Sequence, residues 1–95
     1  MTAMVIGADY LGAIEGKMRD MGITEIAHIK GRNPGDAKKF NIPKSAVFVL
    51  VFTDYINHNM AKVVKSHAKA QSIPLVYAKR SWCAVERKLA GLGLN

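Results

Sequence analysis

Apolar residues gather in four short stretches of the chain, and each stretch predicts a β-strand. Residues Ala46 to Phe52 are apolar without interruption, a pattern typical of a central strand covered on both faces in a parallel sheet. Shorter apolar runs predict strands at Met4–Gly7 and Ile73–Ala78. Alternation of apolar and polar residues predicts a further strand at Ile23–Ile29.

Three other segments have the spacing and the end signals of helices. They are Tyr10–Met21, Asn57–Ser72 and Trp82–Leu92. Asp9 precedes the first helix as a candidate N-cap, and Gly22 follows it as a candidate stop.

Between the second and third strands, residues Gly31–Ser45 are rich in glycine, proline and basic residues and predict a long loop, with one helical turn near Asp36–Phe40. The order is then strand, helix, strand, loop, strand, helix, strand, helix. Right-handed crossovers convert this order into a four-stranded parallel sheet with helices on both faces. We therefore expect one α/β domain over residues 1–95, a minimal Rossmann-like or flavodoxin-like three-layer fold with strand order 2-1-3-4.

The composition is that of a globular protein, with 49% hydrophobic and 22% charged residues, which excludes disordered, collagen-like and coiled-coil chains. No apolar run approaches the roughly 20 residues of a membrane span, and we see no signal peptide. The single cysteine, Cys83, fits a reducing cytoplasm. A core this small is thin, so a large ligand would need a second copy of the chain to help cover it.

The chain carries 14 Lys and Arg against 7 Asp and Glu, a formal net charge of +7. This excess favours an anionic partner, such as nucleic acid, a phosphorylated or carboxylated small molecule, or an acidic surface. The alternative is that the charge only keeps a small protein soluble.

Ligands of open parallel sheets bind beyond the carboxyl ends of the strands. The residues that follow the four predicted strands are Gly7–Tyr10, His28–Arg32, Thr53–His58 and Lys79–Ser81. Most of the polar residues that could bind a ligand or take part in a reaction lie in these segments. A parallel sheet would bring them to one edge.

Residues Gly7–Gly12 have the length of a dinucleotide-binding G-x-G-x-x-G turn, but Asp9 stands in place of the middle glycine. A carboxylate there would repel the pyrophosphate that this glycine normally admits. An ordinary turn from strand to helix is therefore the better interpretation.

His58 opens a row of basic residues on the second helix. Lys62, Lys65 and Lys69 fall within about 40° of it around the helix axis, and the apolar residues point the other way. His58 is thus a candidate ligand residue. The alternative is an exposed first-turn histidine that is hydrogen-bonded to Asp54, and the lysine row by itself also fits a solvated face.

The remaining candidates are weaker. His67 lies on the apolar side of the same helix and is expected to be a half-buried packing residue, whereas His28 could face the sheet edge. The spacing of the histidines does not fit a structural zinc site, and Cys83 is expected to be a packed thiol. No nucleophile elbow, catalytic triad or paired-carboxylate motif appears, so catalysis has no positive support.

Five short motifs, in this order and spacing, resemble the bacterial domain of unknown function 2325 family. They are Gly7-Ala8-Asp9, His28-Ile29-Lys30-Gly31-Arg32, Asp54-Tyr55-Ile56-Asn57-His58, Val64 to Lys69, and Ile73-Pro74 with Arg80-Ser81. The chain departs from the family pattern at Ala8, where glycine is common, and at Cys83 beside Trp82. The resemblance implies a Rossmann-like fold and makes haem binding, which has been linked to the family, an expectation here.

On that expectation, His58 is the favoured axial ligand of the iron and His28 is the next. The predicted cofactor-binding residues are His58, His28, Tyr10, Asp54, Tyr55, Lys62, Arg32, Arg80 and Ser81, with the cationic members facing the propionates. Apolar walls must dominate the affinity, because exposed ion pairs give only about 0–1 kcal/mol each. Tyr10, Tyr55, Ile56 and Trp82 are expected to supply these walls, and a homodimer is expected to enclose the ligand.

Three other functions remain open. The first is binding of an anionic small molecule or nucleotide at the same strand ends, through Lys30, Arg32, Arg80 and helix N-terminal amides. The second is non-specific nucleic-acid binding through the basic surface, for which no recognition motif is visible. An enzymatic role ranks last.

Overall fold

The computed structural model describes residues 1–30 and 40–93. In chain order its elements are β1 (Thr2–Ile6), α1 (Ala13–Asp20), β2 (Glu25–Ile29), β3 (Ala46–Phe52), the short 3-10 helix η1 (Thr53–Tyr55), α3 (His58–Gln71), β4 (Leu75–Ala78) and α4 (Trp82–Ala90). All four predicted strands and all three predicted helices are present. The helical turn predicted near residues 36–40 lies largely outside the described residues.

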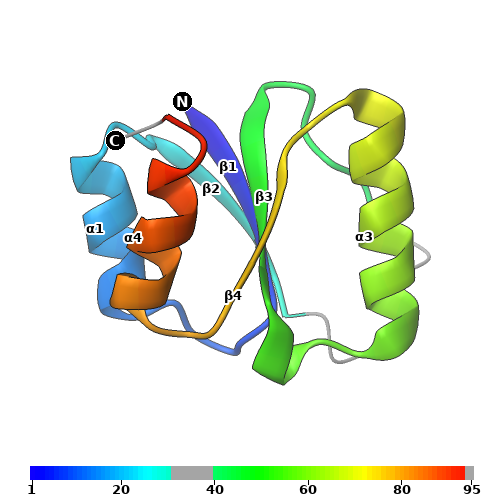
Figure 1. The fold of residues 1–95 in the computed structure, drawn as a ribbon, viewed down its shortest axis with the longest axis horizontal. Coiled ribbons are helices and arrows are strands. Elements are labelled where there is room, and N and C mark those ends of the chain that lie inside the picture. The colour runs from blue at the N-terminus through cyan, green and yellow to red at the C-terminus, as the bar shows by residue number, and fades with distance from the viewer. Residues whose placement is uncertain (31–39, 94–95) are drawn as a thin grey trace.

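The four strands form one parallel sheet in the order β2-β1-β3-β4, as predicted. Helices α1 and α4 lie together on one face of the sheet, and α3 lies on the other (Figure 1). The chain therefore has the α/β architecture of a minimal Rossmann-like or flavodoxin-like fold. No described helix is long and apolar enough to cross a membrane.

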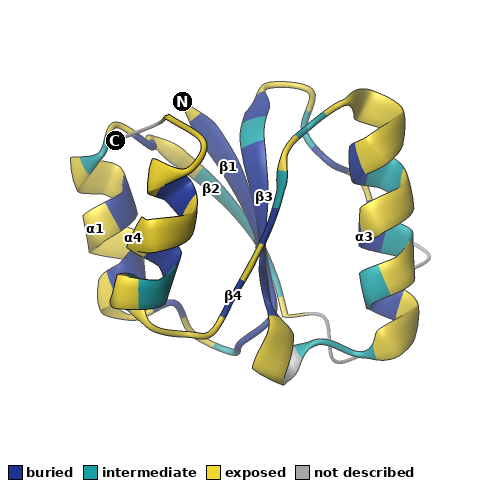
Figure 2. Ribbon diagram, viewed as in Figure 1, coloured by how far each residue is buried: buried dark blue, intermediate teal, exposed yellow. Residues whose placement is uncertain are grey.

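The two faces of the sheet carry separate apolar cores. On one face, Ile14 and Met18 of α1 and Val85 and Leu89 of α4 join a buried cluster with inward-facing strand residues. On the other face, buried residues of α3 pack against alternate residues of the same strands. Strand β3 contributes to both cores and is buried along almost its whole length (Figure 2), which explains its uninterrupted apolar sequence.

The first helix begins later than the sequence predicted. Gly12, at φ 58° and ψ −136°, stands in the position before α1 and has a backbone conformation that a helix does not allow. Asp9 is therefore not the N-cap, and no side chain caps this helix. The predicted stop at Gly22 is confirmed, because Gly22 follows the helix with φ 98°, a conformation that favours glycine.

The other two helices differ in how they begin. The Oδ1 atom of Asn57 accepts a hydrogen bond from the backbone N–H of Met60 at 3.1 Å, which caps α3. Ser81 occupies the N-cap position of α4, but its side chain makes no capping hydrogen bond.

Candidate functional site

The carboxyl ends of all four strands meet at one edge of the molecule, which we call the carboxyl edge (Figure 1). It is formed by residues 7–12, 30, 53–58 and 79–81. Because β3 and β4 are parallel neighbours, Asp54 and Arg80 lie at this same edge. The predicted convergence of the strand ends is therefore confirmed.

The carboxyl edge has a positive electrostatic character. The α-helices among residues 1–30 and 40–93 all begin there, so the positive ends of their dipoles face it. Exposed Lys30, Lys79 and Arg80 add cationic side chains, against the carboxylates of Asp9 and Asp54. This arrangement favours the binding of an anion.

The loop that joins β1 to α1 lies close against the neighbouring strand. Gly7 has φ 104°, and a Cβ atom placed there would lie 3.0 Å from the backbone oxygen of Phe52 and 3.1 Å from its Cβ. Ala8 has φ 63°, in the left-handed region that L-residues enter at a cost. Glycine at position 7 is therefore required by close contact between β1 and β3, which the sequence motif alone did not reveal.

His28 holds this loop in place from β2. Its Nε2 atom lies 2.9 Å from the backbone oxygen of Gly7 and 3.0 Å from that of Ala8. Carbonyl oxygens only accept hydrogen bonds, so Nε2 carries a proton and donates it to both. Nε2 of His28 is therefore engaged, and only Nδ1 has a lone pair left for a ligand.

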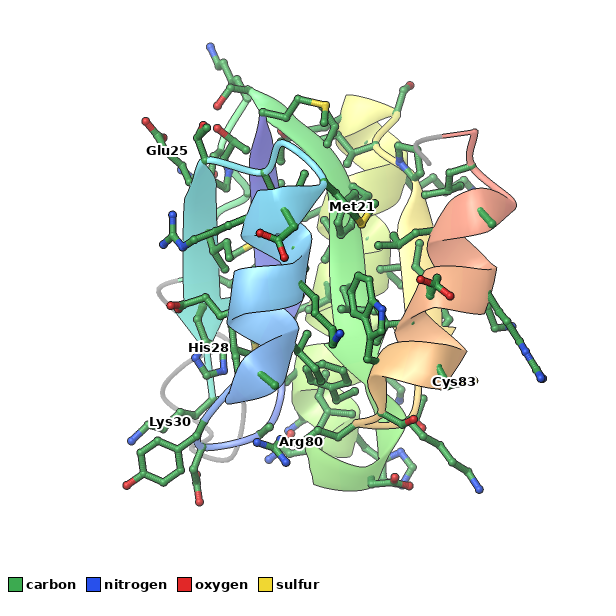
Figure 3. The ribbon with its side chains drawn as sticks, turned by 90° about the vertical axis from the view of Figure 1, so that its left-hand side faces the viewer. Met21, Glu25, His28, Lys30, Arg80 and Cys83 are labelled. Carbon is green, nitrogen blue, oxygen red and sulfur yellow. The ribbon has the colours of Figure 1, made fainter. Side chains whose placement is uncertain are left out.

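Arg80 holds the same loop from the other side. Its Nε atom donates a hydrogen bond of 2.9 Å to the backbone oxygen of Tyr10, whose side chain is 77% exposed. His28 and Lys30, at the end of β2, and Arg80, after β4, thus come together at the carboxyl edge (Figure 3). Sequence analysis predicted that these residues lie at one edge, but not that His28 and Arg80 bond to the loop.

His58 is the first residue of α3 and is exposed. It makes no hydrogen bond or ion pair with any residue that the structure describes. Asp54, in η1, is likewise exposed and makes no hydrogen bond to His58. The imidazole of His58 is thus open to a ligand at the carboxyl edge.

The remaining predicted site residues are only partly described. Lys62 is exposed one helical turn after His58, and Ser81 is exposed at the start of α4. Arg32 lies outside the described residues, and so does the side chain of Tyr55.

The predicted apolar walls do not come together. Trp82 is half-buried with the α1 and α4 cluster, where its Nε1 atom donates a hydrogen bond of 3.2 Å to Oε2 of Glu86. Ile56 is half-buried in the cluster beneath α3, on the opposite face of the sheet. The expectation that both line one ligand surface is therefore wrong.

The sequence also predicted packing roles for His67 and Cys83. His67 is half-buried and packs edge-on against Phe40, with ring centroids 5.1 Å apart and an interplanar angle of 83°, which confirms its predicted packing role. Cys83 is exposed, so the prediction of a packed thiol is wrong. Its position on the outer side of α4 leaves Val85 and Leu89 to make the contact with the sheet.

A pocket of about 390 Å³ lies at the opposite edge of the sheet, where β3 and β4 begin. It is lined by Asn41, Ile42, Pro43, Lys44, Gln71 and Ile73. Sequence analysis did not propose a site here, because only Ile73 of these residues belongs to one of the five motifs. Within residues 1–30 and 40–93, no group of three or more His, Cys, Asp or Glu side chains could hold a metal ion.

Comparison with known proteins gives one match. A family model described as an uncharacterized protein conserved in bacteria, the domain of unknown function 2325, matches residues 2–92. No match was found among the curated proteins or among the solved structures.

Proposed function

The chain belongs to the domain of unknown function 2325 family, and from this premise we propose that it binds haem at the carboxyl edge, with His58 as the axial ligand of the iron. The observation that carries the proposal is the exposed imidazole of His58, which no described residue engages. Neutral imidazole is a common ligand of haem iron.

The donor set fits haem better than a bare metal ion. The described residues offer no cluster of three metal-ligating side chains, so a bare ion at His58 would have at most two such ligands from the described residues. Porphyrin supplies four nitrogen ligands of its own, and a single imidazole then suffices. Of the two predicted ligand histidines, His58 fits better, because the Nε2 atom of His28 already donates to backbone oxygens.

The cationic side chains suit the propionates of the cofactor. Lys62 follows His58 by one turn of α3, and Arg80 and Lys30 are exposed at the same edge. Exposed ion pairs contribute only about 0–1 kcal/mol each. They would therefore orient the cofactor, while most of the affinity comes from buried apolar area at about 25 cal/mol per Å².

One copy of the chain offers little apolar surface for this purpose, because Trp82 and Ile56 turn into opposite cores. Tyr10, which is 77% exposed, remains a candidate wall. The proposal therefore includes a homodimer that encloses the haem between two carboxyl edges. It also includes a cytoplasmic location, which rests on the lone cysteine of the chain.

A titration with ferric haem tests the proposal. The wild-type protein should shift the Soret band saturably, and sedimentation should show a doubling of mass when haem is added. His58→Ala should abolish the shift. His67→Gln is the matched control, because His67 lies on the same helix but packs against Phe40, and it should bind haem as the wild type does. A shift that survives in His58→Ala contradicts the assignment of the ligand.

A second function is favoured by Arg80, which is held beside the N-termini of α1 and α4 by its bond to Tyr10. In this alternative the carboxyl edge binds a phosphorylated small molecule or a nucleotide and His58 is not needed. Adding millimolar ATP should then raise the melting temperature of both the wild type and His58→Phe, and Arg80→Ala should remove the effect. A rise that requires His58 would contradict this alternative.

A further inference from the structure

The outer surface of α3 carries a row of cations with no acidic neighbour on the helix. The row consists of Lys62, Lys65 and Lys69, all exposed, and we call it the lysine row. These residues are three and four positions apart, so they lie on one side of the helix and span about 10 Å along its axis. No residue of α3 is acidic.

On the opposite face of the sheet, the positive and negative charges of α1 and α4 are more nearly balanced. Helix α1 contains Lys17 and Arg19 together with two acidic residues, and α4 contains Arg87 and Lys88 together with Glu86. Glu15 and Arg19 approach to 3.9 Å on α1, whereas no lysine of the row pairs with a carboxylate among residues 1–30 and 40–93. The excess positive charge of the described helices is therefore concentrated on α3.

We propose that the lysine row binds the phosphate backbone of duplex nucleic acid. Duplex DNA carries one negative charge per about 1.7 Å of its axis, so a straight row about 10 Å long can meet several phosphates at once. Apart from His58 at its first residue, the exposed side of α3 carries no aromatic ring, and so lacks the series of stacking platforms that binding of single strands uses. Duplex is therefore favoured over single strands, and the contact is independent of base sequence.

An anionic membrane is a poorer partner for the same charges. Helices that bind membranes in the interface insert an apolar face into the lipid. The apolar residues of α3, Met60, Val64 and Ala68, are buried against the sheet and are not available for insertion. The outward side of the helix is exposed and polar (Figure 2).

The proposal does not rest on haem binding, and its test uses the protein without haem. Fluorescence anisotropy with a labelled 20-base-pair duplex measures the affinity between 50 and 200 mM KCl. Three phosphate contacts give a slope of log K against log salt of about −2.7, or about 40-fold weaker binding over this range. The wild type should show a slope at least this steep.

The decisive comparison uses two variants of equal charge. Lys62→Gln/Lys65→Gln/Lys69→Gln removes the lysine row and should weaken binding at 50 mM KCl more than tenfold, with a slope smaller by about 2.7. Lys17→Gln/Arg87→Gln/Lys88→Gln removes the same charge from the other layer and should change the affinity less than threefold. Circular dichroism of both variants should match that of the wild type, because all six side chains are exposed.

Three results would overturn the proposal. Equal losses in the two variants would show that only the overall charge matters. Failure of the wild type to bind the duplex at 50 mM KCl would remove the interaction itself. The wild type could also bind phosphatidylserine vesicles more tightly than the duplex. If the variant without the lysine row loses that binding, the surface belongs to membranes instead. A haem titration of Lys65→Gln/Lys69→Gln, which keeps Lys62 beside His58, separates this surface from the carboxyl edge.

Discussion

Replacing Gly7 with alanine tests the packing that shapes the carboxyl edge, and we expect it to destabilise the protein by about 2–5 kcal/mol. An L-residue with positive φ loses about 1–2 kcal/mol, and Gly7 has φ 104°. The added Cβ would also lie 3.0 Å and 3.1 Å from atoms of Phe52, the buried last residue of β3. Overpacking of this kind adds about 1–3 kcal/mol.

Urea denaturation of the wild type and of Gly7→Ala measures the loss, against a total stability of about 5–14 kcal/mol for a chain of this length. Ala8→Gly is the matched control at the next position. This substitution relieves backbone strain at φ 63°. It also raises the entropy of the unfolded chain and removes a buried methyl group, which both destabilise the protein. Because these effects oppose each other, the free energy of unfolding should stay within about 1 kcal/mol of the wild-type value. A Gly7→Ala variant within about 0.5 kcal/mol of the wild type would refute the reasoning.

Two further predictions concern hydrogen bonds around the same edge. His28→Ala should lower the free energy of unfolding by about 1–3 kcal/mol, because the buried carbonyl oxygens of Gly7 and Ala8 lose their donor. Thermal denaturation that shows no loss of stability would contradict a stabilising role for these hydrogen bonds. Asn57→Ala should cost about 0.5–2 kcal/mol, since its side chain caps α3, whereas Ser81→Ala should cost less because Ser81 makes no capping bond. Equal losses in a urea denaturation series would contradict this difference.

The strands and the strand order could be predicted because local pattern and topology agree. The continuous apolar run Ala46–Phe52 is the strand β3, with the bounds that the sequence predicts, since only a central strand covered on both faces needs such a run. Right-handed crossovers then left few orders for four parallel strands. The helix Asn57–Ser72 is correct to one residue at each end.

Other features depend on tertiary contacts that a local pattern does not contain. The late start of α1 follows from the backbone of Gly12, although the apolar spacing runs on through that position. His28 finds its acceptors in residues about 20 positions earlier in the chain, and this pairing exists only because β2 lies beside β1. The wall residues Trp82 and Ile56 flank different strands, and proximity to one edge did not reveal that they turn to opposite faces.

The central claim, that the carboxyl edge is where the ligand binds, is tested most directly by NMR of the ¹⁵N-labelled protein during addition of ferric haem. The paramagnetic iron should broaden the backbone amides of residues 7–12 and 53–58 and leave those of residues 41, 42, 44 and 71–73, at the opposite edge, unchanged. Broadening centred on the pocket formed by residues 41–44, 71 and 73, with residues 53–58 unaffected, would contradict the account.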